Sequence, residues 1–134
     1  LDWMVQKVTE LGVDRLVLLH ADRSVVRWKP DRVERRLARL QRIADEAARQ
    51  SRRVRRLVVE APRPAGELLD GFVVAEPGGR AVTAADHSIA VGPEGGWSEG
   101  ELNAARETID LGLTILRTET AAVAVSALCV AFER

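Results

Sequence analysis

The chain has little of the chemistry that binds metals or cross-links a protein. Its 134 residues include one cysteine, Cys129, and two histidines, His20 and His87. A single cysteine excludes an internal disulfide, and one buried thiol is typical of a reducing compartment such as the cytoplasm. The three side chains do not follow a metal-ligand spacing. We therefore expect a cytoplasmic protein without a metal site.

Long apolar runs are also missing from the sequence. The longest one, Ala121–Phe132, contains Ser126 and is much shorter than the roughly 20 residues that a membrane helix needs. No signal-peptide pattern opens the chain at Leu1. The sequence thus predicts no membrane association, and its length fits one domain with a core of its own.

The net charge is zero, but the two signs are separated along the chain. The segment from Arg23 to Arg56 holds 13 basic and 4 acidic residues, whereas the remainder holds 7 basic and 16 acidic ones. Such a basic segment is a candidate surface for a polyanion. A solvated helix face explains many of its arginines equally well, so charge alone does not name a partner.

The hydrophobic pattern predicts an α/β fold with a mostly parallel sheet flanked by helices, because short apolar runs alternate with amphipathic segments. We expect strands over residues 15–19, 57–59, 71–75, 88–91 and 114–116. We expect helices over residues 2–11, 31–50, 98–110 and 120–132. Asp31 with Glu34, and Ser98 with Glu101, form candidate capping boxes. The last helix is apolar almost all round, which indicates a deep core position or a subunit interface.

Three turns follow predicted strands, at Glu76–Gly79, Gly92–Trp97 and Leu116–Ala121. Glycine removes side-chain bulk, and a helix start exposes unpaired N–H groups, so such turns bring main chain up to a ligand. We expect them to form one pocket. The sequence lacks a Walker loop and the G-x-G-x-x-G fingerprint, so the pattern alone does not name the ligand.

Six stretches form a combined motif that is specific, although each part alone is weak. They are Gly92-Pro93-Glu94-Gly95-Gly96-Trp97 with Glu101, Leu111-Gly112, Leu116-Arg117-Thr118-Glu119-Thr120-Ala121, Thr9–Val13, Arg23–Val26, and Glu46–Ser51 followed by Arg53. With this motif the chain resembles the SPOUT superfamily of RNA methyltransferases over essentially its whole length. Within that superfamily it is most similar to the family that makes 3-methyluridine in 16S rRNA.

The resemblance implies a SPOUT fold with a C-terminal trefoil knot, and an obligate homodimer that would cover the apolar last helix. Members of the family also carry an N-terminal PUA-like RNA-binding domain and a strand ahead of the first helix. Residues 1–134 are interpreted as the SPOUT methyltransferase domain without these two parts. Arg52 stands where the family commonly has glycine, which leaves the turn before Arg53 open.

The resemblance also implies S-adenosylmethionine as the cofactor, bent over the three turns, and 16S rRNA in the small ribosomal subunit as the partner. The residues expected to bind the cofactor are Ala75, Glu76, Gly92, Pro93, Glu94, Gly95, Leu111, Leu116, Arg117, Thr120 and Ala121. The residues expected to bind RNA are Arg23, Arg49, Arg52 and Arg53.

Methyl transfer to uracil N3 requires alignment of the two groups, loss of the N3 proton and stabilisation of the resulting charge. Arg53 and Arg117 are candidates to favour the uracil anion. Glu94 and Glu119 are candidates for the base, although hydrogen bonding to a tight turn or to the cofactor explains them as well.

Two other functions remain open at this point. One is a non-catalytic RNA-binding domain that uses the segment from Arg23 to Arg56. The other is a SPOUT methyltransferase that acts on another RNA or on the ribose 2′-OH. Affinity for S-adenosylmethionine separates the first of these from an enzyme.

Overall fold

The computed structural model describes residues 1–25, 27–112 and 115–132. Its helices are α1 (Asp2–Glu10), α2 (Val33–Gln50), α3 (Glu99–Ala104) and α4 (Thr118–Phe132), with short 3-10 turns η1 (Pro30–Arg32), η2 (Ala65–Glu67) and η3 (Leu69–Gly71). Its strands are β1 (Arg15–His20), β2 (Val58–Pro64), β3 (Val73–Arg80), β4 (Ile89–Ala90) and β5 (Glu107–Ile109).

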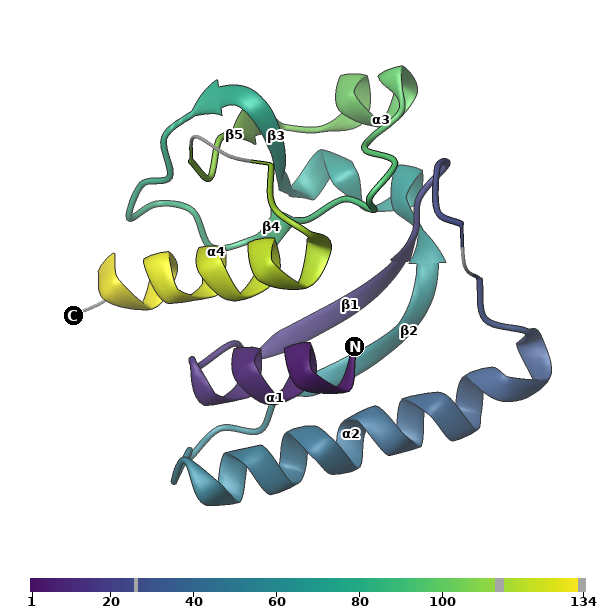
Figure 1. Ribbon diagram of the computed structural model, residues 1–134, viewed down its shortest axis with the longest axis vertical. Helices are drawn as coiled ribbons and strands as arrows, with labels where there is room; N and C mark the ends of the chain where they lie inside the picture. Colours follow the sequence, from purple (N-terminus) through teal and green to yellow (C-terminus); the bar gives the residue numbers. More distant parts are fainter. Residues whose placement is uncertain (26, 113–114, 133–134) are drawn as a thin grey trace.

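Every strand pair in the described residues is parallel, as the sequence predicts. β1 pairs with β2, and β3 lies between β4 and β5. α1 packs on both α2 and α4, and α2 also packs on β2 (Figure 1). The protein is therefore an α/β structure in which helices flank parallel strands. No described helix has the length and hydropathy to cross a membrane.

Helix α2 contacts the core through a narrow stripe. Leu40, Ala44 and Ala47 are its buried residues, and they recur at helical spacing. Gln41 fastens the helix to the chain at β2: its amide nitrogen donates to the Leu57 carbonyl oxygen at 2.7 Å, and its amide oxygen accepts the Val59 N–H at 2.9 Å. The opposite side of α2 is left to its charged residues.

The start of α2 differs from the expected capping box of Asp31 and Glu34. The chain enters the helix through η1, and neither η1 nor α2 begins with a side-chain capping hydrogen bond. Pro30 explains the difference. Its ring fixes φ near the helical value, and it has no N–H group that a cap would have to satisfy.

The region after α3 is the main correction to the predicted elements. The capping box of Ser98 and Glu101 is confirmed, but α3 ends at Ala104 instead of continuing to residue 110. Residues 107–109 form β5, whose Ile109 is completely buried against Val73 and Val125. The predicted strand at 114–116 is wrong for Ile115 and Leu116, which lie in no strand, while Thr114 lies outside the described residues.

Two strands continue past the residues that were expected to end them. β2 runs through Pro62 to Pro64, which a strand tolerates because its other edge has no ladder partner in the described chain. β3 runs through Gly78 and Gly79 to Arg80, after a break in its register with β5. A Cβ atom on Gly79 would lie 2.6 Å from the Ile109 nitrogen. Glycine is thus required at position 79, where the backbone of β3 packs directly on the backbone of β5.

Helix α4 is buried along one side only. Ala121, Val125 and Ser126 are buried, whereas Leu128 and Phe132 are 38% and 45% exposed. Of the two alternatives for this helix, the deep core position is therefore wrong for the single chain. The open side of α4 is the part for which the sequence suggested a subunit interface.

Candidate functional site

The predicted turns meet around a cavity with a volume of about 270 Å³, named the smaller cavity because a second one has about 630 Å³. Nine of the eleven residues expected to bind the cofactor line it: Ala75, Glu76, Gly92, Pro93, Glu94, Gly95, Leu111, Leu116 and Ala121. Arg117 and Thr120 are exposed and do not belong to this lining. The structure thus brings main chain from three separate segments together at one place.

Trp97 shapes the turn after β4. Its indole is 4% exposed and donates to the Ala75 carbonyl oxygen at 3.1 Å. A Cβ atom on Gly92 would lie 2.8 Å from the Trp97 ring, so only glycine fits there. Gly96 has φ of +78° and donates its N–H to the Pro93 carbonyl oxygen at 2.9 Å. The turn is therefore stabilised by a backbone hydrogen bond of its own and by packing of Gly92 on the Trp97 ring.

Thr118 joins the start of α4 to this turn. Its hydroxyl donates to the Gly92 carbonyl oxygen at 2.8 Å, which fixes one wall of the smaller cavity against another. The sequence contains Thr118 within the motif of residues 116–121 but gives no reason to assign it this contact.

Asp110 lines the smaller cavity and fixes the chain on both sides of it by hydrogen bonds. Its carboxylate accepts the N–H of Gly78 at 3.0 Å and the N–H of Gly112 at 3.1 Å. The Gly78 N–H is the main cause that lowers the pKa of Asp110 from its ordinary value, and the Gly112 N–H adds to it. Asp110 is not among the site residues predicted from the sequence. An acidic residue directly before the Leu111-Gly112 pair is the pattern that could have identified it.

The lining of the smaller cavity is acidic. It includes the carboxylates of Glu76, Glu94 and Asp110, and no basic side chain among the described residues lines it. Such a pocket suits a ligand that carries positive charge beside apolar and hydrogen-bonding parts.

Arg53 lies at the turn between α1 and β1. Its guanidinium donates to the carbonyl oxygens of Val13 at 2.7 Å and Thr9 at 3.3 Å, and it pairs with Asp14 at 2.7 Å. Arg53 lines neither cavity. The structure therefore does not bring Arg53 together with Glu94 in this chain.

The other predicted site residues lie apart from one another. Glu119 lines the larger cavity, and Arg23, Arg49 and Arg52 are exposed. Arg52, which stands where glycine is common in the family, adopts φ of +56°. The arginine therefore takes the left-handed conformation that glycine adopts most easily, and the turn before Arg53 is kept.

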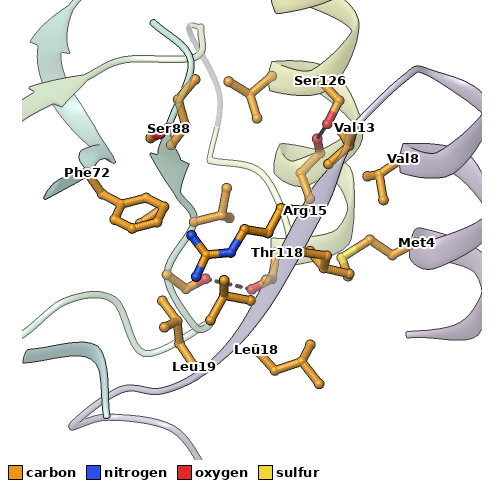
Figure 2. Close-up of a pocket in the computed structure, with 18 of the residues that line it drawn as sticks. Met4, Val8, Val13, Arg15, Leu18, Leu19, Phe72, Ser88, Thr118 and Ser126 are labelled. Atoms are coloured by element: carbon orange, nitrogen blue, oxygen red, sulfur yellow. Dashed lines mark hydrogen bonds between the residues drawn. The ribbon is translucent and has the colours of Figure 1, made fainter. Parts of the chain in front are cut away.

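The larger cavity, of about 630 Å³, lies between β1 and β4 (Figure 2). Figure 2 shows Met4 and Val8 of α1, Leu18 of β1 and Phe72 around it, with Ser126 of α4 beyond. All six residues of β1 and both of β4 line it, so each strand turns an edge toward the space. In the described chain β1 pairs only with β2, and β4 only with β3. These two edges have no strand partner across the cavity.

Comparison with known proteins identifies the class to which this fold and site belong. The family model of the RNA methyltransferase domain matches residues 1–130. The chain belongs to this RNA methyltransferase family.

Two relatives place the chain more narrowly. It is similar to the ribosomal RNA small subunit methyltransferase E of Bacillus subtilis, with 33% identity over 90% of this chain and 57% of the relative. It is 32% identical to the protein of the same name from Aquifex aeolicus, over 98% of this chain and 63% of that relative. The chain thus spans about three fifths of the length of these relatives.

Solved structures agree with this placement. The ribosomal RNA small subunit methyltransferase E of Neisseria gonorrhoeae, determined with bound S-adenosylmethionine, has a TM-score of 0.80 and 34% identity over 95% of this chain and 59% of its own. A Legionella pneumophila protein in complex with S-adenosylmethionine has a TM-score of 0.86 over 97% of this chain and 60% of its own. Its 23% identity supports the shared fold alone.

Proposed function

We propose that this chain is the catalytic domain of an S-adenosylmethionine-dependent methyltransferase of ribosomal RNA, and that it methylates uridine N3 of 16S rRNA in the cytoplasm. The observation that carries the proposal is the meeting of the turns at Ala75–Glu76, Gly92–Gly95 and Leu116–Ala121 around one cavity. The names of the relatives and the cofactor in the Neisseria gonorrhoeae structure support the reaction and the cofactor.

The residues present fit the cofactor. Main-chain groups of the three turns are available to its adenine, ribose and methionine parts, and the acidic lining suits its positive sulfonium. When bound, the cofactor supplies an electrophilic methyl group. The chain's part is to align the target nitrogen with that group and to stabilise charge. Arg53 and Arg117 stay candidates for charge stabilisation, and Glu94 and Glu119 stay candidates for the base.

We propose that an added strand, outside the 134 residues, fills the larger cavity and joins the two sheets into one. The unpaired edges of β1 and β4 and the apolar walls favour a strand over a small ligand. Leu1 lies at the cavity wall, so a strand ahead of α1 would be connected directly. A chain extended by that strand should bind a hydrophobic dye less than the 134-residue chain does. Equal dye binding would contradict the proposal.

We also propose the two finer features of the fold that the resemblance implies. One is a C-terminal trefoil knot, and the other is a homodimer that covers the open side of α4 at Leu128 and Phe132. Light scattering should give twice the mass of one chain at micromolar concentration. Leu128→Asp should lower that mass to one chain, because it places a charge in an apolar contact.

The decisive experiment has two parts. Calorimetry should show that the protein binds S-adenosylmethionine, and mass spectrometry of nucleosides from treated 16S rRNA should show 3-methyluridine. A 2′-O-methylated nucleoside, or methylation of another RNA only, would support the related SPOUT activity instead. RNA binding by folded protein without any affinity for S-adenosylmethionine would support the non-catalytic RNA-binding domain.

A further inference from the structure

Arg23 places its guanidinium on the rim of the smaller cavity. Its Nη1 donates to the carbonyl oxygen of Gly95 at 3.4 Å, and Gly95 is part of the cavity lining. The side chain is exposed and forms no ion pair with another described residue. Its charge is thus available to a group that approaches the cavity from solvent.

The backbone of Arg23 is held against the same turn. A Cβ atom on Gly95 would lie 3.1 Å from both the Cβ and the carbonyl oxygen of Arg23, which shows how closely the two segments pack. Ala21, two residues earlier, is 2% exposed and belongs to the core cluster that contains Trp97. The segment that follows β1 and the turn that follows β4 therefore share one packed contact.

Glu101 locks this contact. Its carboxylate is 4% exposed and accepts the N–H of Asp22 at 2.9 Å with one oxygen and the N–H of Ser98 at 2.9 Å with the other. The Ser98 hydroxyl in turn donates to the Asp22 carboxylate. The buried Glu101 carboxylate thus links Asp22, next to Arg23, to Ser98, which follows Trp97.

A comparison with Arg53 shows why the Arg23 guanidinium is available to a ligand. The Arg53 side chain is 11% exposed and already donates to several acceptors at the α1–β1 turn. Arg23 is exposed, lies at the cavity and has a fixed backbone. An arginine that acts on a bound nucleotide needs an exposed guanidinium next to the cavity and a backbone that holds it there.

We propose that Arg23 is a catalytic arginine that contacts the target uracil beside the cofactor pocket, and that Glu101 is the positioning residue that holds it there. The inference rests on the proposed methyltransferase function. In that reaction uracil N3 loses its proton to solvent or to one of the two candidate bases, Glu94 and Glu119, and forms a bond to the methyl carbon, while the electron pair of the broken sulfur–carbon bond stays on sulfur. The guanidinium stabilises the negative charge that N3 and its neighbouring oxygen atoms carry before transfer.

Three acidic residues lie near Arg23. Asp22 precedes it in the chain, and the carboxylates of Asp22 and Glu101 both accept hydrogen bonds from Ser98, which fixes their positions. Glu94 is exposed on the neighbouring turn. The guanidinium therefore remains the positive group nearest to the Gly95 rim among the side chains with a described contact there.

The test is the rate of a single turnover at saturating rRNA and cofactor, measured from about pH 6 to about pH 9.5. Arg23→Ala should lower the rate at neutral pH by about 10²-fold and move the rise of rate with pH to higher pH, because the uracil loses its proton less readily. Arg23→Lys should restore part of the rate. Glu101→Gln should shift the pH profile in the same direction by less, since one of its two acceptor oxygens is lost.

Controls separate this role from folding and from RNA affinity. Arg106→Ala, an exposed change between α3 and β5, should leave the saturated rate and its pH profile unchanged. Circular dichroism must show that each variant is folded, and calorimetry should show cofactor affinity within about twofold of the unchanged protein. If Arg23→Ala keeps the saturated rate and its pH profile and loses only RNA affinity, the inference is overturned. If the unchanged protein neither binds cofactor nor methylates RNA, the proposed function fails instead.

Discussion

Arg53 donates a 2.7 Å hydrogen bond to the carbonyl oxygen of Val13, 40 residues earlier in the chain. The same guanidinium also donates to the Thr9 carbonyl oxygen and the Asp14 carboxylate. It therefore satisfies hydrogen-bond acceptors at the end of α1 and just before β1 together. Arg53 is therefore a structural link between α1 and the segment that follows α2. Any role it has in catalysis is added to this one.

Arg53→Ala should lower the free energy of unfolding by about 2 kcal/mol, because it leaves partly buried carbonyl oxygens without a charged donor. Urea denaturation measures the change. Arg55→Ala is the matched control: its side chain is 81% exposed and lies 3.4 Å from the same Asp14. It should change stability by less than about 0.5 kcal/mol. Equal effects for both variants would contradict the structural role of Arg53.

Gly79→Ala should destabilise the protein by about 2 kcal/mol or more, because its Cβ would lie 2.6 Å from backbone atoms of Thr108 and Ile109 that cannot move aside. Gly100→Ala is the control, since a Cβ there meets nothing within 4 Å and α3 gains a better helix former. It should raise stability by about 0.5 kcal/mol. Thermal unfolding of the two variants should therefore shift in opposite directions.

Asp86 should make stability depend on acid pH. The paired Arg80 guanidinium lowers the pKa of this buried carboxyl from 3.8 to about 2. A lowered folded-state pKa means that the stabilisation is complete above about pH 4 and is lost as pH falls toward 2. The contribution is about 2 kcal/mol. Urea titrations at several pH values should show a smaller acid loss for Asp86→Asn, whereas Asp70→Asn, on the surface at η3, should behave like the unchanged protein.

Arg52 should separate stability from RNA affinity. Its φ of +56° is costly for arginine and easy for glycine, so Arg52→Gly should raise the free energy of unfolding by up to about 1 kcal/mol. The same change removes an exposed charge, so RNA affinity should fall and its dependence on salt should flatten. Arg52→Asn should relieve strain less but lose the same charge. An unchanged salt slope would remove Arg52 from the RNA surface.

The acidic cavity should prefer the positively charged cofactor over its neutral demethylated product. Glu94→Gln should reduce that preference by about threefold, as expected for one exposed charge within about 6 Å. Calorimetry with both ligands measures the ratio, and added salt should reduce it in the unchanged protein. Glu99→Gln, an exposed change on α3, should leave the ratio unaltered.

The sequence predicted those features that depend on neighbours along the chain. Parallel strands, the capping box of Ser98 and Glu101, and the turns around the smaller cavity all follow from local patterns. β5 was missed because three residues, Glu107–Ile109, are too few to show a strand period, and only the buried contact of Ile109 fixes them.

Side-chain partners that are distant in the sequence were not predictable in the same way. The sequence predicts glycine at position 92 because the main chain there must approach the ligand. The Trp97 ring already leaves no room for a Cβ atom, so Gly92→Val would disturb the turn itself. Arg23 is one of the four arginines that the sequence assigns to RNA, since no local pattern shows that Gly95 lies against it, 72 residues away.

The Asp110 carboxylate has a consequence for the motion of the cavity wall. Because one side chain accepts the N–H groups of both Gly78 and Gly112, any movement of the Asp110 carboxylate away from the turns breaks both hydrogen bonds at once. Their amide hydrogens should therefore exchange with deuterated solvent in a correlated way, as a single opening unit formed by segments 34 residues apart. Ligand bound in the cavity should slow both exchanges together.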